Sequence, residues 1–168
     1  TGYATTDFNV WPVFSKTILV ILMFVGACAG STGGGIKVSR LLILCKSARK
    51  ELQLYLHPNA VKKIKMDDKA IPHEVVRATN MFLFVYIMIF VTSLLIISLD
   101  NLDMVSNFTA IAATLNNIGP GLGAVGPTGN FNTYSYISKA VMIFDMLAGR
   151  LEIFPMLVLF LPDTWRKF

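Results

Sequence analysis

The stretch from Ala78 to Leu99, ATNMFLFVYIMIFVTSLLIISL, contains 22 consecutive residues without a charged side chain. A helix needs about 20 apolar residues to cross the hydrocarbon core of a bilayer. A buried helix of a large soluble protein would show the same pattern, but a chain of 168 residues has no core thick enough to enclose one. Because the whole chain is 54% hydrophobic and only 15% charged, the sequence predicts an integral membrane protein.

The basic residues cluster on one side of this stretch. Ten of the fifteen Lys and Arg residues lie between Lys37 and Arg77, together with four acids, whereas the 99–136 segment has no basic residue and two acids, Asp100 and Asp103. Short cytoplasmic connections carry the excess of basic residues. We therefore expect the 46–77 link to lie inside and the 99–136 link outside, and we interpret the net charge of +5 as membrane orientation, not as nucleic-acid binding.

Two further hydrophobic stretches lie on either side of this one, and neither is a plain spanning segment. The first, from about Pro12 to Cys45, is too long for one crossing and contains the Gly30–Gly35 segment, GSTGGG. Three consecutive glycines should break a helix, since each costs about 1 kcal/mol relative to alanine. Close helix packing would explain the Gly26/Gly30 pair but does not require three glycines, so we favour a flexible loop inside the membrane that opens or obstructs a pore.

The segment after Ser106 has the pattern of a pore loop. Asn107 to Leu115 predicts a helix of about two and a half turns, too short to span a bilayer. The Asn116–Gly121 segment, NNIGPG, cannot continue it as a helix. Irregular backbone at membrane depth is tolerated only where protein or a water-filled cavity surrounds it.

An internal repeat agrees with this layout. Ser15 to Gly26 aligns with Ser138 to Gly149, with four identical residues in twelve columns. Each copy follows a glycine-containing turn, Thr1-Gly2-Tyr3 in one and Asn117-Ile118-Gly119 in the other. Backbone carbonyls can replace the water shell of a potassium ion without supplying a full charge, and glycine allows conformations that turn them inward. We favour a duplicated pore-loop unit, with ordinary external turns as the alternative for each site alone.

The third hydrophobic stretch, from about Tyr136 to Leu161, contains Asp145, Arg150 and Glu152. At 100° per residue, Asp145 and Glu152 would share one face of a continuous helix and Arg150 would point away from both. A charge within a spanning helix usually faces a cavity or a partner. Arg150 is therefore a candidate barrier beside a cation pathway, with a structural salt bridge to another helix as the alternative.

Taken together, these segments resemble the TrkH branch of the Trk/Ktr/HKT superfamily of potassium transporters. The resemblance covers the whole chain in order, through the strings TGYATTDF (1–8), AGSTGGGIK (29–37), HPNAV (57–61), ATLNNIGPGLG (113–123) and GRLEIF (149–154). It implies an all-α membrane fold of helix–pore loop–helix repeats, four of them around one pore in the family. By the same resemblance, residues 1–46 end the third repeat, 47–77 form a cytoplasmic basic link, and 78–168 form the fourth repeat. The chain would thus be the C-terminal portion of a longer protein.

The resemblance also implies residue roles. The potassium filter would include residues of both turns: Thr1, Gly2, Tyr3, Asn116, Asn117, Ile118 and Gly119. The gate would comprise the glycine-rich loop and the arginine: Gly30, Ser31, Thr32, Gly33, Gly34, Gly35 and Arg150. The family implies a multi-pass protein of the inner cell membrane, working as a homodimer with a cytosolic nucleotide-binding regulator of the TrkA type. It implies potassium uptake by symport, with the ion as substrate and no cofactor.

Three alternatives remain from the sequence. A Ktr-like, sodium-dependent transporter would share the same motifs, and a purely structural membrane subunit would share the hydropathy. An intramembrane enzyme would use Asp145, Arg150 or Glu152, but no metal-binding cluster or nucleophile–base pair accompanies them. Two soluble-protein motifs fail in detail: Pro127 follows the GLGAVG segment (121–126) where a dinucleotide-binding helix should begin, and Val38 replaces the Ser or Thr of a phosphate loop. Cys28 and Cys45 lie in apolar segments and indicate reduced thiols.

Overall fold

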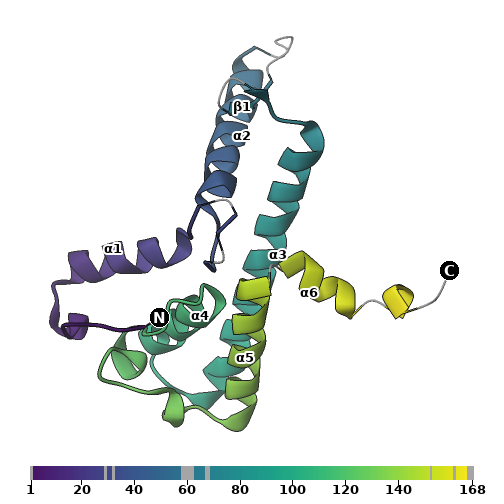
Figure 1. The fold of residues 1–168 in the computed structure, drawn as a ribbon. Helices are drawn as coiled ribbons and strands as arrows, with labels where there is room; N and C mark the ends of the chain where they lie inside the picture. Colours follow the sequence, from purple (N-terminus) through teal and green to yellow (C-terminus); the bar gives the residue numbers. More distant parts are fainter. Residues whose placement is uncertain are drawn as a thin grey trace.

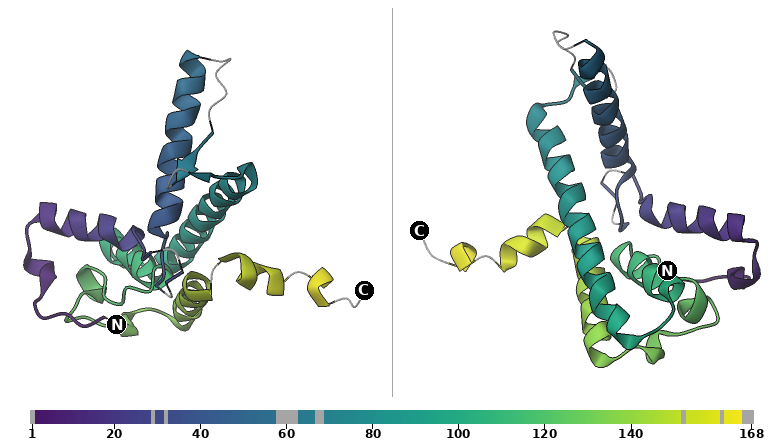
Figure 2. Two further views of the ribbon diagram at one scale, coloured as in Figure 1. Left: turned by 45° about the horizontal axis from the view of Figure 1, so that its top comes forward. Right: turned by 180° about the vertical axis from the view of Figure 1, so that it is seen from behind.

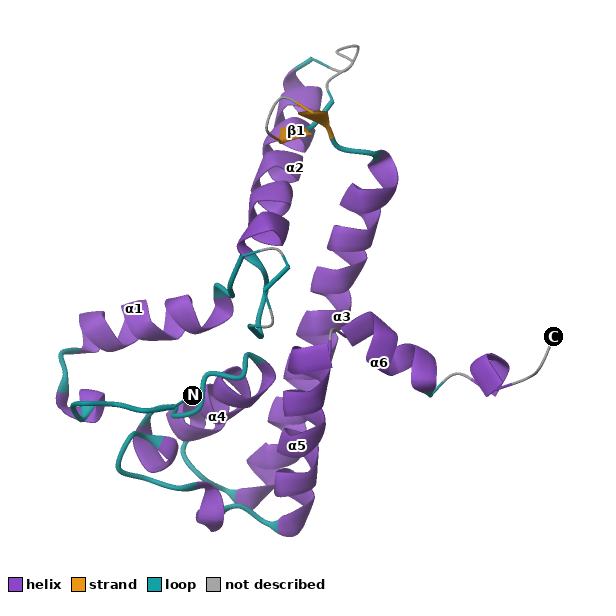
Figure 3. Cartoon of the chain, in the orientation of Figure 1, coloured by secondary structure: helices purple, strands orange, loops and turns teal. Residues whose placement is uncertain are grey.

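The computed structural model describes residues 2–28, 30–31, 33–57, 63–66, 69–151, 153–160 and 162–165. The named secondary-structure elements of the described part are helices, apart from a two-stranded antiparallel hairpin, β1–β2, in which Lys65 pairs with Ala70 and Met66 with Lys69. Figure 1 and Figure 3 show the arrangement of the elements. Their bounds are η1 Phe8–Val10, α1 Val13–Phe24, α2 Val38–Leu56, β1 Lys65–Met66, β2 Lys69–Ala70, α3 His73–Ile97, η2 Ser98–Asp100, α4 Met104–Leu115, η3 Gly123–Val125, η4 Phe131–Thr133, α5 Tyr136–Leu151, α6 Ile153–Leu159 and η5 Pro162–Trp165.

The uncharged stretch forms α3, the longest helix of the described residues. Its 25 residues extend about 37 Å, enough to cross the hydrocarbon core. Among the described helices it alone has the length and apolar composition required of a membrane span, counting His73–Asp100. Phe84, Ile87 and Leu95 are exposed on one side, and Phe82, Phe90 and Ile97 are buried on the other. α3 therefore packs one face against the protein and presents an apolar face outward.

The first hydrophobic stretch is interrupted, as the sequence predicts, but over a longer segment. α1 ends at Phe24 and α2 begins at Val38, so the non-helical part extends well beyond Gly30–Gly35. Figure 1 and Figure 2 show α1 and α2 running in clearly different directions on either side of this break. α2 then continues to Leu56, ten residues past position 46, and forms the first third of the segment assigned to the link.

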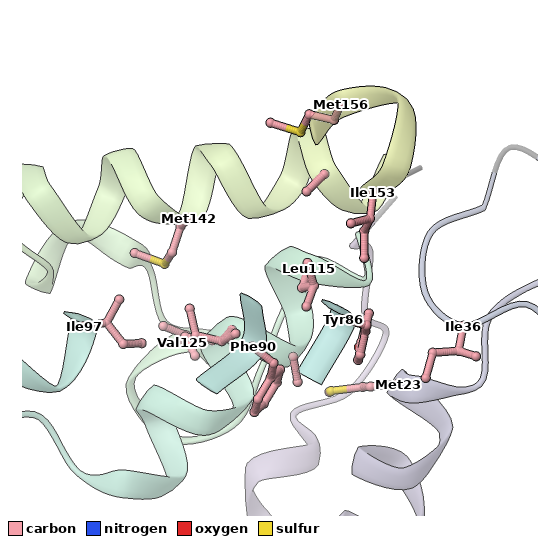
Figure 4. Packing of buried hydrophobic residues seen from close by; sticks show 14 of the residues in the cluster. Met23, Ile36, Tyr86, Phe90, Ile97, Leu115, Val125, Met142, Ile153 and Met156 are labelled. Carbon is pink, nitrogen blue, oxygen red and sulfur yellow. The ribbon is translucent and has the colours of Figure 1, made fainter. Parts of the chain in front are cut away.

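α4 is short and enclosed. Its 12 residues extend about 18 Å, less than the thickness of a bilayer core. It begins at Met104, three residues before the predicted start, because the carboxylate of Asp103 accepts the Ser106 N–H at 3.0 Å and caps the helix. Its buried face packs at the centre of the hydrophobic core with α3 and α5, as Figure 4 shows for Leu115, Phe90 and Met142.

The third hydrophobic stretch is two helices, not one. α5 ends at Leu151, and α6 begins at Ile153 and leaves in another direction (Figures 1 and 2). Pro155 accounts for the change of direction. In a continuous helix its ring would clash with the carbonyl of Leu151, four residues earlier, and it has no N–H to donate to that carbonyl. The prediction that Asp145 and Glu152 share a helix face depends on Glu152, which lies outside the described residues.

The two halves of the internal repeat make equivalent hydrogen bonds. Lys16 donates to the Asn9 carbonyl at 3.2 Å, and Lys139 donates to the Asn132 carbonyl at 3.4 Å, in each case seven residues back along the chain. Both asparagines lie in short 3-10 helices, η1 and η4. A side chain caps the start of each of these helices. Asp7 Oδ1 accepts the Asn9 N–H at 2.9 Å, and Asn130 Oδ1 accepts the Asn132 N–H at 3.0 Å. The repeat thus extends upstream of the aligned serines.

Candidate functional site

The Asn116–Gly119 turn is built from the C-terminal end of α4. Asn117 adopts a left-handed conformation, with φ of 55°. Its N–H donates to the Thr114 carbonyl at 3.1 Å, and the Ile118 N–H donates to the Ala113 carbonyl at 2.9 Å. These two bonds form a Schellman motif, which ends a helix by satisfying its last carbonyls. The short helix therefore directs its C-terminal end, carrying roughly half a negative charge, toward the turn.

The two glycine turns found in the sequence meet in space. Gly2 has φ of +83° and Gly119 has φ of +117°, both in the region that favours glycine. A methyl group at Gly119 would lie 2.7 Å from the Gly2 Cα, too close for two carbon atoms. Because 117 residues separate the two glycines, their contact supports treating the turns as parts of one site.

Hydrogen bonds to three helices, α3, α4 and α5, fix the turn. The Tyr86 hydroxyl of α3 donates to Asn116 Oδ1 at 2.8 Å, and Asn116 Nδ2 donates to the Ala112 carbonyl at 2.9 Å. Asn117 Nδ2 donates to the Met146 carbonyl of α5 at 3.1 Å. Tyr86 is buried, and sequence reasoning overlooked it. Its signal was a tyrosine in the middle of an apolar span, where tyrosine is less typical than at membrane interfaces.

Polar residues of α4 hold the segment that follows the turn. The Thr109 hydroxyl accepts the Leu122 N–H at 2.9 Å, and the Ser106 hydroxyl accepts the Ala124 N–H at 2.9 Å. From the other half of the chain, Asn9 Oδ1 accepts the Gly123 N–H at 3.0 Å. Sequence reasoning did not single out these residues. Polar side chains such as Ser106 and Thr109 shortly before a Gly- and Pro-rich segment do, however, indicate hydrogen bonds that support its backbone.

The 25–37 loop closes on itself between α1 and α2. Val25 and Ile36 form a parallel bridge, the Gly26 N–H donates to the Ile36 carbonyl at 2.8 Å, and the Val38 N–H donates to the Ala27 carbonyl at 3.2 Å. Within the loop, Ser31 Oγ accepts the Gly33 N–H at 3.2 Å. The base of the loop is thus fixed by backbone hydrogen bonds.

The glycines of this loop lie directly against the turn. A methyl group at Gly34 would lie 2.5 Å from the Asn116 carbonyl oxygen, and one at Gly35 would lie 3.0 Å from Asn116 Oδ1. Gly30 has open space around its Cα and a φ of +81°. Gly34 and Gly35 therefore have a steric reason, which is their close approach to the backbone and the side chain of Asn116.

Arg150 lies beside the same loop. It is exposed and lines a small cavity, of about 30 Å³, with Ser31, Gly33, Gly35 and Tyr86 among its neighbours. Arg40 of α2 also lines this cavity, and its guanidinium lies 4.1 Å from the centre of the Phe82 ring. Within the described residues, Arg150 forms no ion pair. Asp145 is fully buried elsewhere on α5 and accepts from Ser93 Oγ at 2.8 Å.

Two acids lie before and at the start of α4. Hydrogen bonds from the Ser106 side chain and backbone lower the pKa of Asp103. The Ser135 N–H donates to Asp100 Oδ2 at 3.0 Å, which joins the end of α3 to the start of α5. Asp103 is therefore ionised at neutral pH on the predicted outer side.

The structure thus brings together most of the residues singled out in the sequence. Gly2, the Asn116–Gly119 turn, the 25–37 loop and Arg150 form one contiguous site, whereas Thr1 and Thr32 lie outside the described residues. Within the described ranges, no group of three or more His, Cys, Asp or Glu side chains could hold a metal ion. At the Asn116–Gly119 turn, oxygen atoms are supplied by backbone carbonyls and by the amide side chains of Asn116 and Asn117.

Known proteins are similar to this chain in sequence. The family profile TrkH, described as "Cation transport protein", matches residues 1–167. The Trk system potassium uptake protein TrkH of Escherichia coli K12 is 43% identical over 166 residues, which cover 99% of this chain and 34% of that protein. The Escherichia coli K12 protein TrkG is 36% identical over the same shares. The chain therefore spans about a third of the length of these relatives.

A solved structure agrees with the fold. The crystal structure of the potassium transporter TrkH from Vibrio parahaemolyticus superposes with a TM-score of 0.85 at 45% identity, covering 98% of this chain and 35% of that one. These relatives are named as transport or uptake proteins, not as enzymes. Their names and the helical architecture confirm an all-α membrane transporter fold. This chain belongs to the TrkH family of cation transport proteins.

Proposed function

We propose that the protein containing this chain takes up potassium through a filter to which the Gly2 and Asn116–Gly119 turns contribute two of several segments. The observation that carries the proposal is the contact of Gly2 with Gly119 at the end of a short, enclosed helix. The C-terminal end of α4 favours a cation at the turn. Backbone carbonyls there would replace the hydration shell of the ion. The names of the relatives as potassium uptake proteins support potassium as the ion.

We propose that the 25–37 loop gates this pathway. Its glycine backbone packs against the Asn116 carbonyl on one side and lines a cavity with Arg150 on the other. A loop so placed obstructs ions leaving the turn until it moves. Its base is fixed by hydrogen bonds to α1 and α2, so motion of those helices would move the loop. The positive charge of Arg150 adds an electrostatic barrier at the same level.

The relatives are named as parts of a Trk system. We therefore propose that the complete protein is a multi-pass protein of the inner membrane that forms a homodimer and binds a cytosolic TrkA-like regulator. The basic segment from Lys46 to Arg77 would lie on the same side of the membrane as that regulator. Potassium uptake would be coupled to the entry of protons or sodium by symport.

The decisive experiment measures potassium uptake by the full-length transporter in cells that lack their own uptake systems. Uptake should saturate with potassium, and Gly119→Ala should abolish it, because the added methyl group would overlap the Gly2 backbone. Competition by sodium separates a potassium pathway from a sodium-dependent, Ktr-like one. Absence of potassium uptake under both sodium and proton gradients would refute the proposal, as would wild-type uptake by the Gly119→Ala protein.

A further inference from the structure

A cavity of about 500 Å³ lies at the N-terminal end of α3, whereas the Asn116–Gly119 turn contacts Tyr86 in the middle of that helix. It opens between the C-terminal half of α2 and the start of α3, beside the β1–β2 hairpin, at the top of Figure 1. α2 contributes Lys50 and Glu51, α3 contributes His73 and Arg77, and the segment before β1 contributes Lys63. The proposed ion pathway uses none of these residues.

The charge of this region is strongly positive. A smaller cavity of about 170 Å³ adjoins the first and shares Lys50 and Lys63 with it. Among the residues that the structure describes, six Lys and Arg side chains and one acid, Glu51, line the two cavities; the basic ones are Lys46, Arg49, Lys50, Lys63, Lys65 and Arg77. No ion pair neutralises Lys50, Lys63 or Arg77 within the ranges that the structure describes. Lys46 donates to the Lys65 carbonyl at 2.7 Å, which fixes the hairpin to α2 without reducing the charge.

Apolar side chains line the same cavity. Ile64, Ile71 and Val76 lie beside the basic groups. Ile64 is buried, and its carbonyl accepts the Ile71 N–H at 2.8 Å, so this wall is held in place by the hairpin. A ligand that fits such a site carries negative charge at one end and an apolar part at the other.

The position of the cavity along α3 gives the depth of the cavity in the membrane. If the uncharged stretch from Ala78 onward occupies the hydrocarbon core, His73 to Arg77 extend about 7 Å beyond it. The headgroup layer on each side is about 5–7 Å thick. The positive-inside rule assigns this end of α3 to the cytoplasmic leaflet. The basic cavity is therefore at headgroup depth.

We propose that this interhelical pocket binds the phosphate group of an anionic phospholipid of the cytoplasmic leaflet. Lys50, Lys63 and Arg77 provide the positive charges, and the Arg77 guanidinium can engage two phosphate oxygens at once. The N-terminus of α3, where Pro72 and His73 line the cavity, adds the positive end of a helix dipole. The wall of Ile64, Ile71 and Val76 contacts the glycerol and upper acyl carbons. Basic pockets between membrane helices on the cytoplasmic side suit such headgroups.

The test titrates the full-length transporter, purified in a neutral detergent, with phosphatidylglycerol and follows lipid-bound species by native mass spectrometry. Phosphatidylglycerol should bind more tightly than phosphatidylethanolamine of the same acyl composition. Each of Lys50→Gln and Arg77→Gln should weaken binding about 5-fold, and the double variant about 30-fold. Glu51→Gln should strengthen it, because a negative charge that lines the pocket is removed. Because the readout is binding, it is independent of ion flux.

Lys69→Gln is the matched control, since Lys69 lies in the same hairpin but does not line either cavity. It should bind phosphatidylglycerol as the wild type does. Equal binding by the double variant, or equal affinity for the two lipids, would overturn the proposal. A parallel titration with inorganic phosphate separates the two sources of the group: variant-sensitive binding of phosphate without binding of lipid would overturn the headgroup assignment. Binding of neither, with an acidic protein partner seated on Lys50 and Arg77, would overturn it too.

Discussion

Gly34 packs directly against the carbonyl oxygen of Asn116, so that a methyl group at Gly34 would lie 2.5 Å from that oxygen. The two residues belong to different parts of the chain, one to the loop between α1 and α2 and the other to the cap of α4. This contact joins the proposed gate to the proposed filter through backbone atoms alone. Any side chain at position 34 must separate the two.

Gly34→Ala should therefore change gating. The methyl group would push the loop away from Asn116 and increase the open probability of the transporter. Single-channel recording or rubidium flux through the reconstituted full-length protein measures this. Cys28→Val is the control, because it adds volume at an exposed position of the same loop. Flux and regulation identical to the wild type in Gly34→Ala would count against gating by this loop.

Tyr86→Phe should loosen the Asn116–Gly119 turn, although the substituted side chain keeps its ring and loses only the hydroxyl group. The variant loses the 2.8 Å hydrogen bond to Asn116 Oδ1, whose removal from a buried site costs about 1 kcal/mol. We expect a small loss of thermal stability and a reduced preference for potassium over sodium, measured by competition in flux assays. Tyr136→Phe, at an exposed tyrosine, should alter neither property. Unchanged selectivity in Tyr86→Phe would show that the side chain supports folding only.

Arg150→Gln should increase cation flux, because it removes a positive charge from the cavity beside the loop. Stability should change by less than about 0.5 kcal/mol, since the side chain is exposed and forms no ion pair within the described residues. Arg150→Lys keeps the charge and should conduct like the wild type. If Arg150→Gln instead unfolds the protein and leaves the flux of the folded fraction unaltered, the residue is structural.

The stability of the α4 N-terminus should depend on pH through Asp103. Its pKa is lowered in the folded protein by the Ser106 hydrogen bonds, so its contribution is present above the unfolded pKa, near 4, and is lost as pH falls through the lower folded value. Asp103→Ala should cost about 1 kcal/mol at neutral pH. Asp103→Asn retains the cap but removes the charge, so its stability should vary less between pH 5 and 3. Thermal unfolding in detergent at several pH values tests both, and equal pH dependence of wild type and Asp103→Asn would exclude this role.

Sequence patterns predicted the individual segments better than the contacts between them. Hydropathy located α3, and the excess of glycine located the break between α1 and α2, because both are local properties of the chain. The approach of Gly34 to Asn116 and of Tyr86 to the same residue depends on how segments 30 to 82 positions apart pack. Helical periodicity indicates the faces of one helix and cannot identify the partner of each face.

Two misjudged features had signals in the sequence. The apolar character of Tyr136–Leu161 concealed the break before α6, although Pro155 predicts an interruption at the carbonyl of Leu151. The Phe-Asn pair occurs at 8–9 and again at 131–132, seven residues before each aligned lysine. Including these pairs would have extended the repeat to the hydrogen bonds that the two halves share.

The buried pair of Asp145 and Ser93 joins α5 to α3, and it should show the asymmetry expected of a polar contact in an apolar core. Ser93 Oγ donates to Asp145 Oδ1 at 2.8 Å, and Oδ2 has no partner within the described residues. Ser93→Ala leaves the carboxyl group without its donor and should destabilise the protein by about 1–2 kcal/mol. Replacing both residues, in Ser93→Ala/Asp145→Val, removes the polar group together with its need for a partner. The double variant should therefore be more stable than Ser93→Ala alone, measured by thermal unfolding of the full-length protein. Additive losses in the double variant would mean that Asp145 contributes through another contact, and a loss of flux in a stable double variant would give the carboxyl group a part in conduction.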